Sequence, residues 1–200
     1  MSDEGQVALF DLDGSLCDFE KALRAGLKSL AAPDEPELPE DLWSMERYEY
    51  IRNRMRLIKS QPGFWLNLER MAPGIDVFYA AKHVGFDTQI LTKGPASIPN
   101  AWMEKVQWCQ RNLPAIDTDI HIVMNKGLVF GKVLYDDFPE YMMAWLEHRP
   151  RGLGIMPPRS CNKDFSHPNV IKYDGSNLQQ VVEALHVAYE RKSGQPLRLP

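Results

Sequence analysis

Cysteine is scarce in this chain. Its 200 residues include three cysteines, Cys17, Cys109 and Cys161, which are widely spaced and form no C-x-x-C pair. This pattern is typical of free thiols in a reducing compartment, so we expect the protein in the cytoplasm.

Long apolar runs and an excess of basic residues are also missing. No run of about 18 apolar residues exists, so we expect no membrane span. Asp3 and Glu4 stand where a secretory signal would carry cations, so we expect no signal peptide. The net charge of −4 is unlike the basic footprint of nucleic-acid-binding proteins. We therefore expect a small-molecule partner and no stable nucleic-acid partner.

What the chain does contain is a hydrophobic share of 44%, enough for a core, with short apolar strands alternating with helical segments. This alternation predicts an α/β fold, a Rossmann-like doubly wound parallel sheet. In the helix 101–112 we expect Trp102, Val106 and Cys109 along one side. The expected strands are Val7–Phe10, Thr88–Leu91, Ile120–Met124, Val133–Tyr135 and later ones within 152–157 and 169–175; the expected helices are Cys17–Ala32, Leu42–Lys59, Phe64–Met71, Ile75–Val84, Ala101–Asn112, Glu140–His148 and Asn177–Lys192.

Polar residues follow four of these strands. In parallel sheets ligands bind at the carboxyl ends of the strands, so these residues should converge on one edge. They are Asp11 and Asp13, Thr92 and Lys93, Asn125 and Lys126, and Asp136 and Asp137.

Carboxylates crowded at one edge repel each other unless a cation neutralises them. Ligands that are all oxygen select a hard ion, and Mg²⁺ is the usual one where phosphate is the substrate. Lys126 and Thr92 supply a cation and a hydroxyl donor for a phosphate, and Gly14 allows a tight turn. The candidate metal ligands are Asp11, Asp13, Asp136 and Asp137.

This set suits phosphoryl transfer. Asp11 can attack phosphorus as a carboxylate nucleophile. Asp13 can protonate the leaving oxygen and then accept a proton from the attacking water. Lys126 would offset charge on the transferring group.

The four strand ends resemble the four motifs of the haloacid dehalogenase-like (HAD) phosphatases: "DLDGS", a Thr after a strand, a downstream Lys, and "YDD". A dehalogenase would normally lack the second Asp, so Asp13 favours a phosphatase. "FDLDGSLCDFE" is similar to the "DMDGVLADFE" opening of the 5'(3')-deoxyribonucleotidases, and Lys126 stands ten residues before Asp136, as in that family. "LW" at 42–43, "GFWLNLERMAPG" at 63–74 and "EKVQW" at 104–108 also have counterparts there, and the resemblance covers roughly residues 7 to 140.

The resemblance implies a Mg²⁺-dependent phosphatase for nucleoside 5'-monophosphates, with deoxyribonucleotides favoured, that works through an aspartyl-phosphate. It also implies a small helical cap at residues 16–73, inserted into a core formed by 1–15 and 74–200. Phe19, Trp43 and either Phe64 or Trp65 would form an apolar pocket for the base, since aromatic faces stack on bases. Lys93 and Phe138 depart from the family, which usually has a hydroxyl residue and a basic residue there.

Several alternatives remain open in the sequence. Asp11 and Asp13 could simply begin a helix, and Lys132 competes with Lys126, although it lies at the start of a strand. The basic residues between 47 and 59 fit a solvated helix face. The function could instead be hydrolysis of another small phosphate ester or a phosphorylated nucleic-acid end, or silent nucleotide binding. A homodimer is possible.

Overall fold

The computed structural model describes residues 5–113, 118–192 and 194–199. Within these ranges the strands form one parallel sheet of six, in the order β3-β2-β1-β4-β5-β6. The strands are β1 (Val7–Phe10), β2 (Asp87–Lys93), β3 (Ile120–Val123), β4 (Val133–Tyr135), β5 (Leu153–Met156) and β6 (Val170–Lys172). The expected doubly wound parallel α/β sheet is confirmed.

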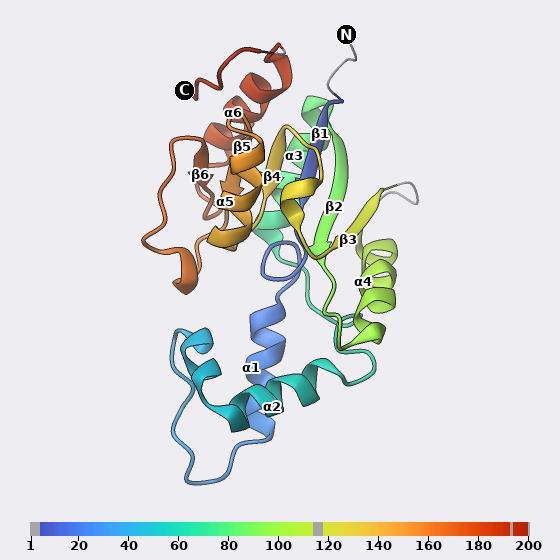
Figure 1. Ribbon diagram of the computed structural model, residues 1–200, viewed down its shortest axis with the longest axis vertical. Coiled ribbons are helices and arrows are strands. Elements are labelled where there is room, and N and C mark those ends of the chain that lie inside the picture. Colours follow the sequence, from blue (N-terminus) through green and yellow to red (C-terminus); the bar gives the residue numbers. More distant parts are fainter. Residues whose placement is uncertain (1–4, 114–117, 193, 200) are drawn as a thin grey trace.

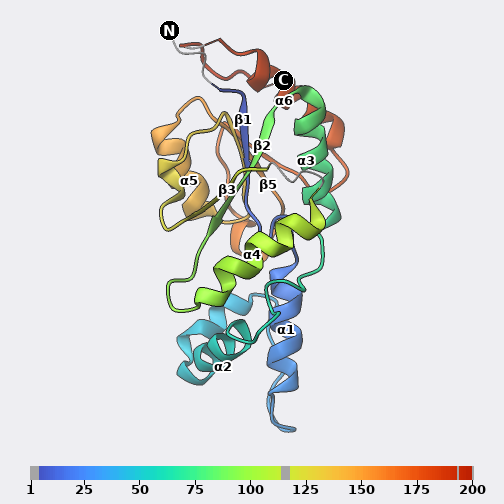
Figure 2. The ribbon, with the colours of Figure 1, turned by 90° about the vertical axis from the view of Figure 1, so that its right-hand side faces the viewer.

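Both faces of the sheet are buried, which explains why its strands are apolar without strict alternation. On one face Phe10 and Tyr135 pack with the helices α3 (Ala72–Val84) and α6 (Leu178–Glu190). On the other, Leu9 and Leu134 pack against α5 (Pro139–His148). Figure 2 shows the sheet between α5 and α3. None of the helices in the described ranges is long and apolar enough to cross a membrane.

The centre of the sheet is a topological switch point. From β1 the chain continues to β2 and β3 on one side, and it later continues from β4 to β6 on the other. At such a point the loops after the two central strands diverge and leave a crevice for a ligand. Asp11 and Asp136 each directly follow one of these two strands.

A second layer lies beyond the carboxyl ends of the strands (Figure 1). It consists of α1 (Phe19–Ser29), the short 3₁₀ helix η1 (Leu42–Arg47) and α2 (Glu49–Lys59), with α1 packed on α2. Buried apolar residues spaced along these helices, among them Leu23, Leu27, Ile51 and Met55, join this layer to the main core. The helix α4 (Pro99–Asn112) lies between the layer and the sheet in Figure 2. We refer to residues 16–73 as the cap, following the sequence-based division.

Two helices expected in the cap differ in the structure. The segment 42–59 is broken at Tyr48, whose backbone is extended, into η1 and α2. The expected helix 64–71 is wrong, because residues 62–67 form turns and the stretch that follows is irregular apart from an isolated bridge between Arg70 and Cys17. The carboxylate of Glu104 accepts the backbone N–H groups of Gly63, Trp65 and Leu66, so a contact with α4 replaces the helical pattern.

Candidate active site

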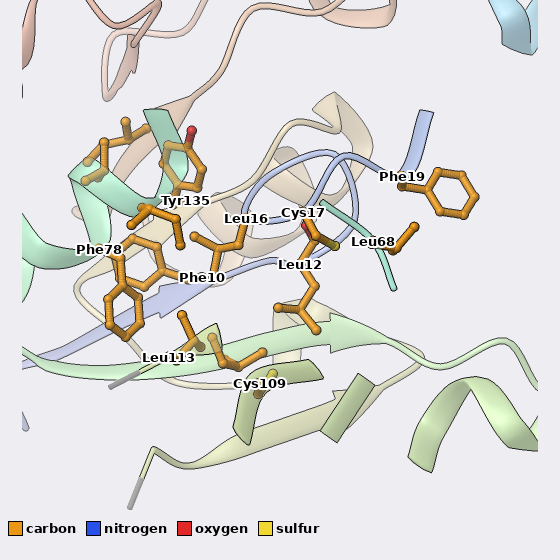
Figure 3. Packing of buried hydrophobic residues seen from close by; sticks show 14 of the residues in the cluster. Phe10, Leu12, Leu16, Cys17, Phe19, Leu68, Phe78, Cys109, Leu113 and Tyr135 are labelled. Atoms are coloured by element: carbon orange, nitrogen blue, oxygen red, sulfur yellow. The ribbon is translucent and has the colours of Figure 1, made fainter. Parts of the chain in front are cut away.

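The loop after β1 is held in shape by its own apolar residues. Leu12, Leu16 and Cys17 are buried and point into the cluster around Phe10 shown in Figure 3. The carbonyl of Leu12 accepts the N–H groups of the residues at 15, 16 and 17. The loop therefore presents Asp11 and Asp13, which alternate with these anchors, to the cavity at the edge of the sheet.

Gly14 allows the two central loops to approach each other. Its φ of +79° lies in the left-handed region, which favours glycine. A Cβ at this position would lie 2.1 Å from Oδ2 of Asp137. Any side chain at Gly14 would thus displace Asp137 from the site.

A buried cluster of three carboxylates lies where these loops meet. One oxygen from each of Asp11, Asp136 and Asp137 lies within 4.8 Å of the other two. Lys126 Nζ lies 2.6 Å from Asp11 Oδ1 and donates to Asp136 Oδ2 at 2.7 Å. Arg159 Nε lies 3.8 Å from Asp137 Oδ2. The sequence-predicted lysine at 126 is thus placed inside the cluster.

The electrostatics show a strained set of charges. Burial raises the pKa of Asp136 to about 6, against the attraction of Lys126, and burial together with the charges of Asp136 and Asp11 holds the pKa of Asp137 well above its ordinary value. Burial alone would lower the pKa of Lys126, but its two carboxylate partners raise it instead. Burial thus disfavours the charged forms of Asp136 and Asp137, and Lys126 does not fully offset this.

These residues fit a hard divalent cation. The donors that meet are all carboxylate oxygens, which are the ligands that Mg²⁺ uses in proteins. A cation would also offset the cost of burying these carboxylates, which is the main cause of the raised pKa values of Asp136 and Asp137, and the repulsion that adds to it. Asp13, which the sequence also suggested as a metal ligand, is not part of this group of carboxylates in the described residues.

Asp13 lines the same cavity as Asp11 and Asp137 and has a different partner. Its Oδ2 accepts a hydrogen bond from Lys105 Nζ at 2.5 Å. Lys105 also donates to Thr92 Oγ1 at 2.9 Å. Burial raises the pKa of Asp13, with Lys105 opposing and Asp11 adding to the shift. A carboxyl group with a raised pKa is suited to carry a proton.

A cavity of about 540 Å³ opens between this edge and the cap. The catalytic candidates Asp11, Asp13 and Lys126 lie on one side, and Phe19, Trp43 and Trp65 lie on the other. Its volume falls within the range of small-molecule sites. The predicted catalytic residues thus lie opposite most of the predicted aromatic residues across the cavity.

The aromatic wall is stacked. The ring of Phe19 lies parallel to that of Trp43, with centroids 6.1 Å apart, and 5.2 Å from that of Trp65. Phe64 meets Phe19 edge-on at 5.8 Å. Phe64 is not among the residues that line the cavity, so it supports the wall from behind.

The two departures from the family pattern both lie at the cavity. Lys93, in β2, lines it and donates to the hydroxyl of Tyr141 at 3.0 Å. Phe138 lines it beside the same tyrosine, with ring centroids 5.0 Å apart. The ring of Tyr141 also lies 4.9 Å from Lys126 Nζ.

The basic residues that competed for roles are now placed. Lys132 lies at the amino end of β4, where it donates to the carbonyl of Arg191, far along the strand from the carboxylates. In the cap, Arg54 pairs with Glu35. Lys59 alone, of the described basic residues between 47 and 59, lines the cavity.

Sequence reasoning missed Lys105 because it grouped Trp102, Val106 and Cys109 along one side of α4 and did not consider the charged residues. Of those three, Cys109 is buried, Val106 is partly buried and Trp102 is exposed. Two adjacent charged residues, Glu104 and Lys105, lie in the buried stripe instead. That stripe consists of Ala101, Glu104, Lys105, Trp108 and Cys109, spaced as one face of a helix.

Arg159 was also missed. It follows β5, and its guanidinium donates to the carbonyl of Gly14 at 2.8 Å. It lies in the late part of the chain, where the sequence offers no motif. Only the fold brings it to the loop after β1.

Comparison with known proteins agrees with this geometry. The structure is similar to that of a haloacid dehalogenase-like family hydrolase from Xanthomonas campestris, with a TM-score of 0.54 and 16% identity, covering 96% of this chain and all of the other. A second haloacid dehalogenase-like hydrolase, from Burkholderia xenovorans, has a TM-score of 0.51 and 20% identity over 86% of this chain and 93% of its own. The fold is therefore that of the haloacid dehalogenase-like hydrolases.

The sequence places the chain more narrowly. Residues 5–180 match the family described as 5' nucleotidase, deoxy (pyrimidine), cytosolic type C protein. A protein of Bordetella bronchiseptica provisionally named 5'(3')-deoxyribonucleotidase is 30% identical over 79% of this chain and 86% of its own. The human cytosolic-type 5'(3')-deoxyribonucleotidase is 29% identical over 64% of this chain and 69% of its own. The chain belongs to this 5' nucleotidase family and is a phosphoric monoester hydrolase.

Proposed function

We propose that the protein is a Mg²⁺-dependent phosphatase that hydrolyses nucleoside 5'-monophosphates, with deoxyribonucleotides favoured. The observation that carries this is one cavity with two unlike sides. Asp11, Asp13, Asp137 and Lys126 line one side, with Asp136 buried behind them, and stacked aromatic rings form the other side. The relatives named as deoxyribonucleotidases support the choice of substrate.

The proposed cation would be held by Asp11, Asp136 and Asp137. When bound, it would supply positive charge beside the phosphate. Lys126 would remain next to Asp11 and offset charge on the transferring group. Thr92 is buried near the end of β2 and does not line the cavity, and its hydroxyl accepts a hydrogen bond from Lys105. It would therefore support the phosphate site from behind, through Lys105.

The reaction would proceed in two balanced steps. A carboxylate oxygen of Asp11 attacks phosphorus, the bond to the ester oxygen breaks, and Asp13 gives that oxygen its proton, releasing the nucleoside. Water then attacks the aspartyl-phosphate and loses a proton to Asp13. The bond between phosphorus and Asp11 breaks, which releases phosphate and restores both carboxyl groups.

The base would lie against Phe19, Trp43 and Trp65, with Phe64 behind them. Stacking on aromatic side chains contributes about 1–3 kcal/mol per base. Lys93 would add a positive charge near the phosphate or the sugar, where relatives of the family usually have a hydroxyl residue. These contacts would set substrate choice and leave the chemistry to the opposite side.

The three thiols support a reducing compartment such as the cytoplasm. Cys17, Cys109 and Cys161 are all free, and the first two are buried. Burial raises the pKa of Cys109 to about 12 and also raises that of Cys17, which makes both poor nucleophiles.

The test is phosphate release from deoxy- and ribonucleoside monophosphates and from sugar phosphates, with Mg²⁺ and with EDTA. Asp11→Asn would run beside Asp87→Asn, a matched control that removes an exposed carboxylate at the start of β2. We expect turnover that needs Mg²⁺ and Asp11 and favours deoxyribonucleotides. Turnover of sugar phosphates alone would refute the nucleotide assignment, and turnover by Asp11→Asn would refute the nucleophile.

A further inference from the structure

Lys105 is a deeply buried charge behind the cavity wall that the proposed reaction does not use. It comes from the middle of α4, and it is 2% exposed. Its Nζ donates to Asp13 Oδ2 at 2.5 Å, to Thr92 Oγ1 at 2.9 Å and to the carbonyl of Lys93 at 2.7 Å. All three acceptors belong to the catalytic edge of the sheet.

An ammonium group has three protons to donate, and these three bonds account for all of them. Lys105 is therefore not available to bind a phosphate oxygen. Lys93 differs from Lys105, because its ammonium group donates to the hydroxyl of Tyr141 at the cavity. Lys105 also does not line the cavity. Its effect on a substrate must pass through the groups that it holds.

Asp13 depends on this contact. The other recorded side-chain partner of its carboxylate, within the described ranges, is the Sγ of Cys17 at 3.9 Å from Oδ1. That thiol lies closer to the carbonyl of Leu12, at 3.2 Å. Asp13 lines the cavity, and with Oδ2 accepting from Lys105, Oδ1 is the oxygen left to carry a proton.

The same turn of α4 also holds the cap. Lys105 Nζ lies 4.8 Å from the centre of the ring of Trp65, which lines the cavity. The adjacent Glu104 accepts the backbone N–H of Trp65 at 3.0 Å and that of Gly63 at 2.8 Å. Two neighbouring residues thus tie the aromatic wall and Asp13 to one helix.

We infer that Lys105 is a positioning residue for Asp13: it holds Oδ2 so that Oδ1 faces the leaving oxygen of the substrate. This rests on the proposed function, in which Asp13 protonates that oxygen. Losing Lys105 should slow the departure of leaving groups that need a proton, and it should spare those that do not.

The test compares two substrates. A deoxyribonucleotide has an alkoxide leaving group that needs protonation, whereas p-nitrophenyl phosphate has one that is stable without it. The quantity to measure is kcat/KM, which reports the steps through leaving-group departure when phosphoryl transfer to Asp11 is irreversible. For Lys105→Met, kcat/KM for the nucleotide should fall about 30- to 100-fold. This is part of the factor of about 10²–10⁴ that general acid catalysis contributes. With p-nitrophenyl phosphate, kcat/KM should fall less than about threefold. Lys82→Met, an exposed lysine of α3, is the matched control.

A double-mutant cycle separates positioning from general damage to the fold. In an Asp13→Asn background, adding Lys105→Met should cause no further loss, because the group that Lys105 holds no longer carries a proton. Additive losses, or equal losses with both substrates, would overturn the inference. Thermal unfolding checks each variant, and Lys105→Ala replaces Lys105→Met if that variant fails to fold. Lys105→Gln, which keeps a donor for Asp13 Oδ2, should recover much of the activity that Lys105→Met loses with the nucleotide.

Failure of the proposed function can be told apart from failure of this inference. If the wild type hydrolyses other alkyl phosphates but no nucleotide, the same contrast is run with the best of them. If it hydrolyses nothing, a crystal structure of the Lys105 variant gives the answer. A displaced Asp13 carboxylate would support the positioning role, and an unmoved one would overturn it.

Discussion

The catalytic edge of the sheet and the cap enclose the same cavity, yet different forces hold them. At the edge, Lys126 pairs with buried carboxylates at 2.6 and 2.7 Å. In the cap, stacked rings such as Phe19 and Trp43 form the wall. Buried charge is intolerant of change because an unpaired partner is costly, whereas apolar contact weakens gradually with lost area. The edge should therefore govern turnover, and the cap should govern affinity.

Removing the positive charge of Lys126 should destabilise the catalytic edge more than any other single substitution. Lys126→Met leaves Asp11 and Asp136 facing each other without their shared partner. We expect the free energy of unfolding to fall by about 3–5 kcal/mol in EDTA, and turnover to fall about 10³-fold. Urea unfolding and steady-state kinetics measure the two effects. Mg²⁺ should restore part of the stability, because it neutralises the same carboxylates.

Lys82→Met is the control for this substitution, since Lys82 is exposed on α3. If Lys126→Met is as stable as this control in the absence of metal, the carboxylate cluster does not need the positive charge of Lys126. The contrast between edge and cap would then fail.

The second prediction concerns the contact that joins the two regions. Glu104→Gln replaces a buried carboxylate that accepts three backbone N–H groups from residues 63–66. We expect about 2 kcal/mol of lost stability, since hydrogen bonds to charged groups are stronger than neutral ones. KM for the nucleotide should rise because Trp65 is less well held. Glu147→Gln, an exposed change on α5, is the control, and equal unfolding curves would contradict the proposed link.

A smaller effect is expected in the aromatic wall. Trp43→Ala removes a ring that lines the cavity and stacks on Phe19. KM for the nucleotide should rise about tenfold, equivalent to about 1.4 kcal/mol of lost stacking, while turnover of glycerol phosphate should not change. Tyr50→Ala is the control, because Tyr50 is an exposed cap aromatic that does not line the cavity. Equal effects on both substrates would place the base elsewhere.

The same contrast explains what the sequence could predict. Strands such as β1 are short and apolar, and acidic residues follow them directly. Both the parallel sheet and the position of Asp11 at its edge could therefore be predicted from the sequence. Parallel topology then brought Lys126 to the same edge. These features follow from local pattern and from one general rule of sheet geometry.

The cap and its link to the core were less readable, because tertiary contacts override local preference there. The stretch 64–71 has helical composition, yet Glu104 takes up the N–H groups at its start. In α4, a buried lysine looks like a surface residue until its partners are known. A charged pair within an otherwise apolar helical stripe was the available signal.

The last prediction is a dependence of stability on pH at the edge, which a change of pH reveals without removing any side chain. Without metal, the pKa of Asp136 is raised from 3.8 to about 6, mainly by burial, and those of Asp13 and Asp137 are raised as well. Between about pH 4 and 6 the native protein therefore holds protons that the unfolded chain has released. The stabilisation from this is complete below pH 4 and is lost as the pH rises from 4 through about 6.

Urea unfolding of the wild type and of Asp136→Asn in EDTA, from pH 4 to 7.5, isolates this contribution. The difference between them should change in favour of the variant as the pH rises, by no more than about 1.4 kcal/mol per pH unit. Asp87→Asn, the exposed control, should show no such trend. Because Mg²⁺ binds the ionised carboxylates, it should stabilise the wild type more at pH 7.5 than at pH 5. A difference that does not change with pH would mean that the burial of Asp136 carries no electrostatic cost, and the edge would then be no more sensitive to charge than the cap.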